Sequence, residues 1–212
     1  MDLPTLIVTI LAIVLAVSYF GGGMLNRRRA TALVRSLRAR FPGSGKTAIS
    51  WRGRNSFRLE LQRPAHGISQ LVASALLAPR EALLVWAVWA VQGRGDLLDL
   101  KADLDAPPRG AGLVFDPRHR LGRAAWQAAE AAGGTVSEAG VGGLRIASYD
   151  EPGRVLMQRL LPLAVEGGDV VLLEVKAAQP RLTVLLSLRG APEAAVSRLP
   201  PMLTGLVAAA TS

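Results

Sequence analysis

The sequence of 212 residues contains no cysteine, only two histidines and only three lysines. The absence of cysteine excludes disulfides, thiolate metal sites and cysteine nucleophiles. The two histidines, His66 and His119, are far apart in the sequence and have no companions at metal-ligand spacing. We therefore expect each to be a loop or helix-cap residue, and we expect neither a metal ion nor a cofactor.

Signatures of catalysis are also scarce. Neither GxSxG nor HExxH occurs. The segment Pro42–Thr47, PGSGKT, is similar to the end of a phosphate-binding loop, but Arg40 stands where that loop needs a glycine, and a helix precedes it where a strand is required. Asp103 and Asp105 end a strand but lack the companions of a phosphatase-like site. We therefore predict that Pro42–Thr47 is a plain turn and that Asp103 and Asp105 are surface carboxylates. We also predict that the protein is not an enzyme and has no small-molecule substrate.

Charge of one sign predominates, because the formal net charge is +9 and most of the positive charge is arginine. Such a balance favours polyanions, either lipid head groups or nucleic acid. Each basic residue near an anionic bilayer gains about 1 kcal/mol. The alternative is a solvated face together with the signal that sets membrane orientation. The candidate contacts to membrane or phosphate are Arg27, Arg28, Arg29, Arg35, Arg38, Arg52, Arg54 and Arg58.

The longest apolar run, Leu3–Phe20, carries no charge and shows no polar stripe. At 1.5 Å per residue it forms a helix of about 27 Å, close to the roughly 30 Å of a hydrocarbon core. Arginines follow the run while only Asp2 precedes it, so the positive-inside rule predicts a single-pass protein of the cell membrane with its N-terminus outside and its domain in the cytoplasm. A cleaved signal peptide is the competing interpretation, with small residues at Ala16 and Ser18, but the basic segment that should precede the run is absent.

The rest of the chain predicts one folded domain, which gives a membrane anchor over 1–25, a basic juxtamembrane helix over 26–41 and a cytosolic α+β domain over 42–212. Residues 48–52 and 56–62 predict a hairpin, and we favour a strand over a short helix for 67–77. Further strands are expected at 96–105, 112–115, 144–149, 170–176 and 182–188, and further helices at 116–132, 154–164 and 192–210.

One stretch, PREALLVWAVWAV, is apolar nearly all round, and Pro79 suits the first turn of a helix there. We expect a buried helix whose Trp86 and Trp89 are core residues. Two alternatives remain: the tryptophans contact lipid or a partner's transmembrane helix, or the stretch is a second or re-entrant span, although its uncharged part is too short to cross a membrane.

In the order of its elements the chain resembles the calumin family, the single-pass subunits of the PAT complex that helps multipass membrane proteins fold beside the translocon. The likeness covers SYFGGGMLNRRRATALVRSL after the anchor, the strand that begins WRGR, PREALLVWAVWAV, DLLDLKADLD, GLVFDPRHRLGRAAW, and near the end LTVLLSLRG with EAAVSRLPPMLTGLV. These are patterns of hydrophobicity and turns. The acidic segment before the anchor and the coiled coil after the domain in that family have no counterpart in this sequence.

The resemblance implies a non-enzymatic protein that assists insertion or folding of multipass membrane proteins, with the membrane, translocon or other membrane-protein subunits, and ribosomal RNA phosphates as partners. The residues alone predict only a domain anchored at an anionic surface. The alternative function is an anchored domain that binds a ligand or a lipid, or that signals, and a deep pocket with convergent polar groups would favour it.

Overall fold

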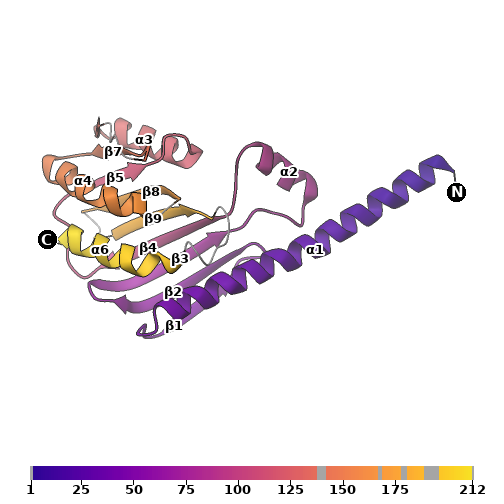
Figure 1. Cartoon of the computed structure of the whole chain (residues 1–212), viewed down its shortest axis with the longest axis horizontal. Helices are drawn as coiled ribbons and strands as arrows, with labels where there is room; N and C mark the ends of the chain where they lie inside the picture. The colour runs from indigo at the N-terminus through magenta and orange to yellow at the C-terminus, as the bar shows by residue number, and fades with distance from the viewer. Residues whose placement is uncertain (1, 138–141, 167–168, 178–180, 189–195, 212) are drawn as a thin grey trace.

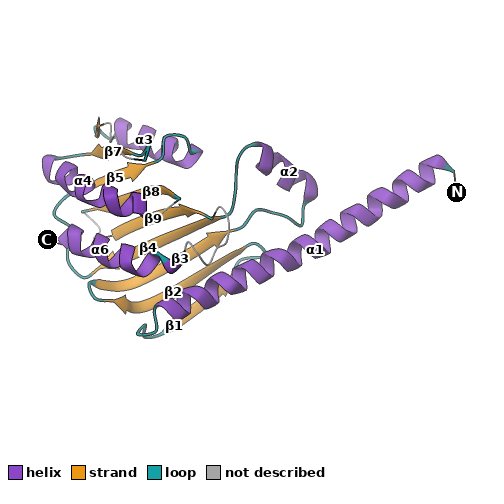
Figure 2. Cartoon of the chain, viewed as in Figure 1, coloured by secondary structure: helices purple, strands orange, loops and turns teal. Residues whose placement is uncertain are grey.

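The structure is a computed structural model that describes residues 2–137, 142–166, 169–177, 181–188 and 196–211. A long N-terminal helix leads into a nine-stranded sheet with further helices packed on it (Figure 1). Every strand pair in the sheet is antiparallel, and helices and strands are not arranged as repeated βαβ units (Figure 2). The predicted α+β class with an N-terminal apolar helix is confirmed.

The strands follow the order β1-β2-β3-β4-β9-β8-β5-β7-β6 across the sheet. In β2, β4 and β9 buried side chains alternate with partly exposed ones, because one face of an antiparallel sheet packs on the core while the other stays polar. The strands are β1 (Thr47–Trp51), β2 (Ser56–Ala65), β3 (Ile68–Leu76), β4 (Leu97–Leu104), β5 (Gly112–Phe115), β6 (Thr135–Ser137), β7 (Arg145–Ser148), β8 (Val170–Lys176) and β9 (Arg181–Ser187).

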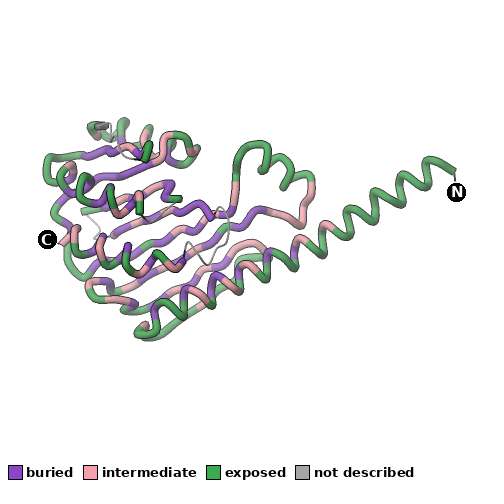
Figure 3. The backbone as a smooth tube through the Cα atoms, in the orientation of Figure 1, coloured by how far each residue is buried: buried purple, intermediate pink, exposed green. Residues whose placement is uncertain are grey.

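Helix α1 (Leu3–Arg40) is continuous through its three consecutive glycines, so the anchor and the basic helix expected after it form one rod. Its first half is exposed, whereas one face of its second half is buried in the main core (Figure 3). The buried apolar residues of that face recur at spacings of three and four, which is the period of a helix packed on one side. They are Ala30, Leu33, Val34 and Leu37, followed by Phe41 just after the helix.

The helices cover the two faces of the sheet unequally. Helices α4 (Glu151–Glu166) and α6 (Leu199–Thr211) share the main core with the second half of α1. Helix α3 (Arg120–Ala131) covers the opposite face only over β8, β5, β7 and β6, where Trp126 stacks on Phe115 at 6.3 Å. The remainder of that face, over β2, β4 and β9, carries ion pairs such as Asp99–Lys101 and is open to solvent.

Most predicted elements are confirmed. β1 and β2 form the expected hairpin, and the ambiguous stretch 67–77 contains strand β3, which pairs with both β2 and β4. The short strand β6 was not expected, since the sequence there is rich in glycine. The helix expected over 192–210 lies partly outside the described residues. Within them, residues 196–197 are helical, Arg198 is in a turn, and α6 follows with Pro200 and Pro201 in its first turn, where proline is tolerated.

Two helix predictions are wrong in ways that matter for function. The apolar stretch after Pro79 forms helix α2 (Leu83–Val91), which begins four residues later than expected and contains no buried residue. Residues 79–82 instead form a turn, because Arg80 is drawn into a polar cluster described below. Helix α3 begins at Arg120 rather than at Asp116, whose carboxylate accepts the backbone N–H of Arg118 and caps the turn before the helix.

Candidate membrane-facing site

The first half of α1 is long and apolar enough to cross a membrane, with no residue of its apolar window buried. Its large side chains stand free on all sides; Leu3 and Phe20 are each 70% exposed. In Figure 1 this half extends away from the sheet as an isolated rod. We call the end of the sheet where α1 leaves it the exit edge; it comprises the β1–β2 turn (52–55), the β3–β4 connection (77–96) and the start of α3 (116–120).

Helix α2 lies within the β3–β4 connection and projects from the exit edge on the side where α1 leaves the sheet (Figure 1). Its nine residues are all apolar, and five of its large side chains are exposed (Figure 3). Val91 is 89% exposed, Leu84 76% and Trp86 40%. A helix that is apolar all round and unburied exposes a large apolar surface, which marks a membrane or protein contact. Trp86 is therefore not a core residue.

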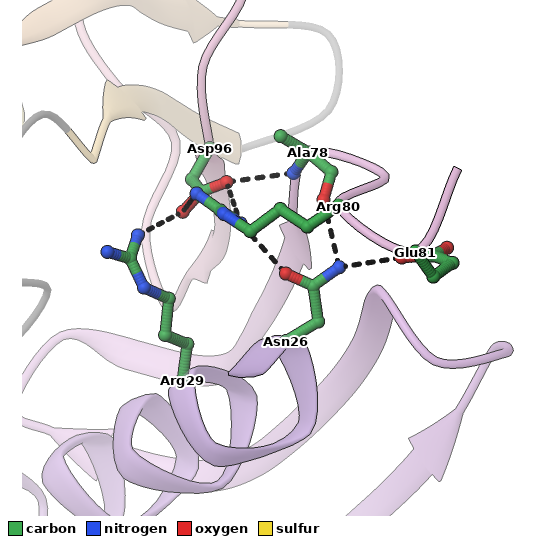
Figure 4. Close-up of polar contacts among 6 residues, drawn as sticks. All are labelled: Asn26, Arg29, Ala78, Arg80, Glu81 and Asp96. Carbon is green, nitrogen blue, oxygen red and sulfur yellow. Dashed lines mark hydrogen bonds and ion pairs between the residues drawn. The ribbon is translucent and has the colours of Figure 1, made fainter. Parts of the chain in front are cut away.

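A buried polar cluster fastens both ends of the β3–β4 connection to α1 (Figure 4). Asp96, whose side chain is 2% exposed, accepts hydrogen bonds from the guanidinium groups of Arg80, at 2.9 and 3.0 Å, and of Arg29, at 2.9 Å. It also accepts the backbone N–H of Ala78 at 2.8 Å. A buried carboxylate with two arginine partners and a backbone donor is well compensated for the loss of water.

Asn26 completes this cluster from the helix side and is fully buried. Its side-chain amide donates to the carbonyl of Ala78 at 2.9 Å and to Glu81 at 3.0 Å, while its oxygen accepts from Arg80 at 2.8 Å. Ala78 and Arg80 each form hydrogen bonds with both Asn26 and Asp96, so these two buried side chains share their partners. The cluster, which we name the clamp, consists of Asn26, Arg29, Arg80, Glu81 and Asp96.

Close backbone contact adds to the clamp. A Cβ atom on Gly22 would lie 2.2 Å from the carbonyl oxygen of Arg80, so only glycine allows the helix to approach this strand connection so closely. Ser18 also donates to the same carbonyl at 3.3 Å. Helix α2 begins three residues after Arg80. Its position along α1 is therefore fixed at the end of the apolar run.

The β1–β2 turn lies at the same level. The guanidinium of Arg54 sits 4.6 Å above the ring of Tyr19, a cation–π contact with the last turn of the apolar run. Gly53 has φ of 76°, the left-handed conformation that tightens this hairpin. Trp51, 48% exposed, flanks the turn. An aromatic and arginine-rich fringe beside the end of an apolar helix is the composition of a membrane–water interface.

The eight predicted phosphate-contact arginines are not brought together. Arg27, Arg28, Arg52 and Arg54 are exposed near the exit edge, and Arg29 is committed to the clamp. Arg35 and Arg38 are exposed but lie about 22–27 Å along the helix beyond Phe20. Arg58 points to the open sheet face, where it pairs with Glu60 at 2.8 Å.

Arginines that sequence analysis did not select line a groove of about 900 Å³ between the C-terminal end of α2 and the start of α3. They are Arg94, Arg118, Arg120 and Arg123, all exposed. The sequence did not predict this grouping, because β4 and β5 lie between Arg94 and the other three arginines in the chain. Trp89 is half-buried in the same groove, with the guanidinium of Arg94 5.6 Å from its ring centre.

Asn26 and Asp96 were also missed, although the sequence carries a signal for the first. Asn26 lies four residues before Ala30 on the stripe that becomes the buried face of α1. A polar side chain on such a stripe needs a buried partner. Nothing local to Asp96 indicates that it is buried.

The other candidate groups have structural roles. His119 caps α3, since its Nδ1 accepts the N–H of Leu121, and His66 is exposed in the β2–β3 turn. Residues 42–46 form a turn before β1, as predicted, and Asp103 pairs with Arg181. In the part of the chain that the structure describes, no group of three or more His, Cys, Asp or Glu side chains could hold a metal ion.

Comparison with known proteins gave no relative: no protein-family model matches the chain, and no curated protein matches it.

Proposed function

We propose that this is a non-enzymatic, single-pass protein of the cell membrane that assists the insertion or folding of multipass membrane proteins. α1 would span the bilayer with its N-terminus outside, and the domain would lie on the cytoplasmic side, because the arginines follow the apolar run. The observation that carries the proposal is α2, an entirely apolar and unburied helix held beside the point where α1 leaves the domain.

Helix α2 is about 13 Å long, less than half of a hydrocarbon core, so it suits one leaflet or the interface rather than a span. Together with the free half of α1 it offers two apolar helices at one membrane surface. A partly inserted membrane segment needs apolar contacts there before its final neighbours are present. The resemblance to the calumin family supports the same role, with the translocon and the ribosome as partners.

The test is site-specific photo-crosslinking during translation of a multipass client into membrane vesicles that contain the full chain. A crosslinker at Trp86 on α2 should capture nascent membrane protein. The same crosslinker at Val155, exposed on α4 away from the exit edge, should not. Ribosomes are expected to sediment with the vesicles. Absence of both crosslinks and ribosomes would refute the proposal.

A second experiment concerns the span. Replacing Leu3–Phe20 with an unrelated apolar helix of equal length should reduce client capture, because α1 is proposed to contact clients as well as to anchor the domain. Full capture after the exchange would reduce α1 to a tether.

Binding of lipid or another ligand is the second candidate, and the arginine-lined groove beside α2 is the observation that favours it. Unlike the first candidate, it requires no client protein.

A further inference from the structure

The groove between α2 and α3 combines a basic wall with an apolar one. Arg120 and Arg123 come from the first turn of α3, Arg118 from the turn before it, and Arg94 from the loop after α2. The apolar wall includes Leu76 and Leu121, which are 45% and 40% exposed, and Trp89.

The positive charge of the groove is largely uncompensated. Asp116 is its single acidic lining residue, and one of that carboxylate's oxygens already accepts the backbone N–H of Arg118 at 2.8 Å. Within the described ranges of the chain, none of the four guanidinium groups forms an ion pair. Arg123 donates to backbone carbonyls, at 3.1 Å to that of Arg118, which fixes its direction.

The place of the groove in the fold points to the ligand. It lies on the exit edge, between the start of α3 and the foot of the exposed apolar helix α2 (Figure 1). Arginine forks match the geometry of phosphate oxygens, and an apolar wall matches glycerol and the first acyl carbons. Basic pockets on the cytoplasmic side of membrane proteins bind anionic head groups for the same reasons.

We propose that this groove binds the phosphate of an anionic phospholipid from the bilayer that holds α1, with Arg118 and Arg120 as the principal contacts. The inference rests on the membrane placement in the proposed function, but not on any client. A phosphodiester without a neighbouring ammonium group, as in phosphatidylglycerol, is preferred over phosphatidylcholine, because choline would place a cation among the arginines.

The test uses the full chain in nanodiscs of phosphatidylcholine with and without phosphatidylglycerol. Lipid retained after gentle release into detergent is identified by native mass spectrometry. The wild type should retain phosphatidylglycerol well above its share of the disc. The double variant Arg118→Gln/Arg120→Gln should lose that enrichment at least several-fold, and Arg118→Lys/Arg120→Lys should recover part of it, since lysine keeps the charge but not the fork.

The matched control is Arg35→Gln/Arg38→Gln, which removes the same charge from exposed positions at the far end of α1. It should retain phosphatidylglycerol like the wild type. Equal loss in the two double variants would show a diffuse charge effect and overturn the assignment, as would unchanged retention in the groove variant.

A soluble phosphate ester is the other source of the same chemistry. Calorimetric titration of inorganic phosphate into discs of phosphatidylcholine alone should give no binding that depends on Arg118 and Arg120. Such binding would assign the groove to a soluble ligand and overturn the lipid source. Client crosslinking from Trp86 is measured separately. If the wild type shows crosslinking but no phosphatidylglycerol enrichment, only the lipid assignment of the groove is rejected. If it shows enrichment but no crosslinking, only the proposed function is rejected.

Discussion

Helices α2 and α6 are both short and strongly apolar, yet their surroundings are opposite. In α6 six residues at helical spacing are buried, and Leu206 is fully inaccessible. In α2 no residue is buried. The difference lies in position: α6 lies on the sheet against α4, whereas α2 lies off the sheet, within the connection between the end of β3 and the start of β4. Apolar composition alone therefore does not make a core helix. An apolar helix that has no polar face and is not buried indicates contact with a membrane or with another protein.

The largest loss of stability is expected when the clamp that holds α2 is removed. Asp96→Ala should leave the half-buried Arg80 and Arg29 without their shared carboxylate, at a cost of about 3–5 kcal/mol in the free energy of unfolding. Denaturation of the detergent-solubilised full chain measures this cost. Asp103→Ala, which removes the partly exposed pair with Arg181, is the control and should cost about 1 kcal/mol or less. Equal costs would show that the clamp contributes no more than a surface pair.

The comparison itself is tested by shortening one leucine in each helix. Leu206→Ala in α6 should lower the free energy of unfolding by about 2–5 kcal/mol, because it creates a cavity in the core. Leu84→Ala in α2 removes the same atoms from a side chain that is 76% exposed, and in detergent it should change stability by about 0.5 kcal/mol or less. Chemical denaturation measures both. Comparable losses would mean that α2 packs on the domain after all.

Two adjacent glycines test whether close packing of α1 on the β3–β4 connection positions α2. Gly22→Ala places a Cβ against the backbone of Arg80 and should destabilise the protein by about 1–3 kcal/mol, since the helix or the connection must move. Gly21→Ala meets nothing within 4 Å and should be neutral or stabilising, by up to about 1 kcal/mol, because alanine favours a helix. Thermal unfolding of both variants separates close packing from helix propensity.

The smallest effect is expected at the start of α4, the helix on which α6 packs. The side-chain hydrogen bond from Arg154, and next to it the charge of Arg154, hold the pKa of the exposed Glu151 below its ordinary value of 4.5. Because this pKa is lowered in the folded state, the pair's contribution to stability is present above pH 4.5 and is lost as the pH falls through the folded pKa. The difference in melting temperature between the wild type and Arg154→Gln should therefore be slight at neutral pH and vanish in acid. A difference that grows in acid would contradict this.

The sheet could be predicted because its strands carry local signals: period-two alternation in β2 and β4, and the turn at Gly53 between β1 and β2. The site could not be predicted in the same way. Periodicity tells an amphipathic helix from a strand but does not tell which solvent surrounds a helix that is apolar on every side, so α2 was assigned to the core. The clamp depends on Asp96 meeting Asn26, two residues separated by 70 positions. Such pairings follow from the folded topology and leave no local trace.

The continuity of α1 has a mechanical consequence. One end of the rod belongs to the domain's core and the other is the candidate span, with no break at which the two could turn independently. An apolar helix tilts where the hydrocarbon core is thinner than the helix is long. If α1 spans the bilayer as proposed, tilt of the span would rotate the whole sheet with it and would move α2 toward or away from the lipid surface. Bilayer thickness would then set the depth of the exit edge.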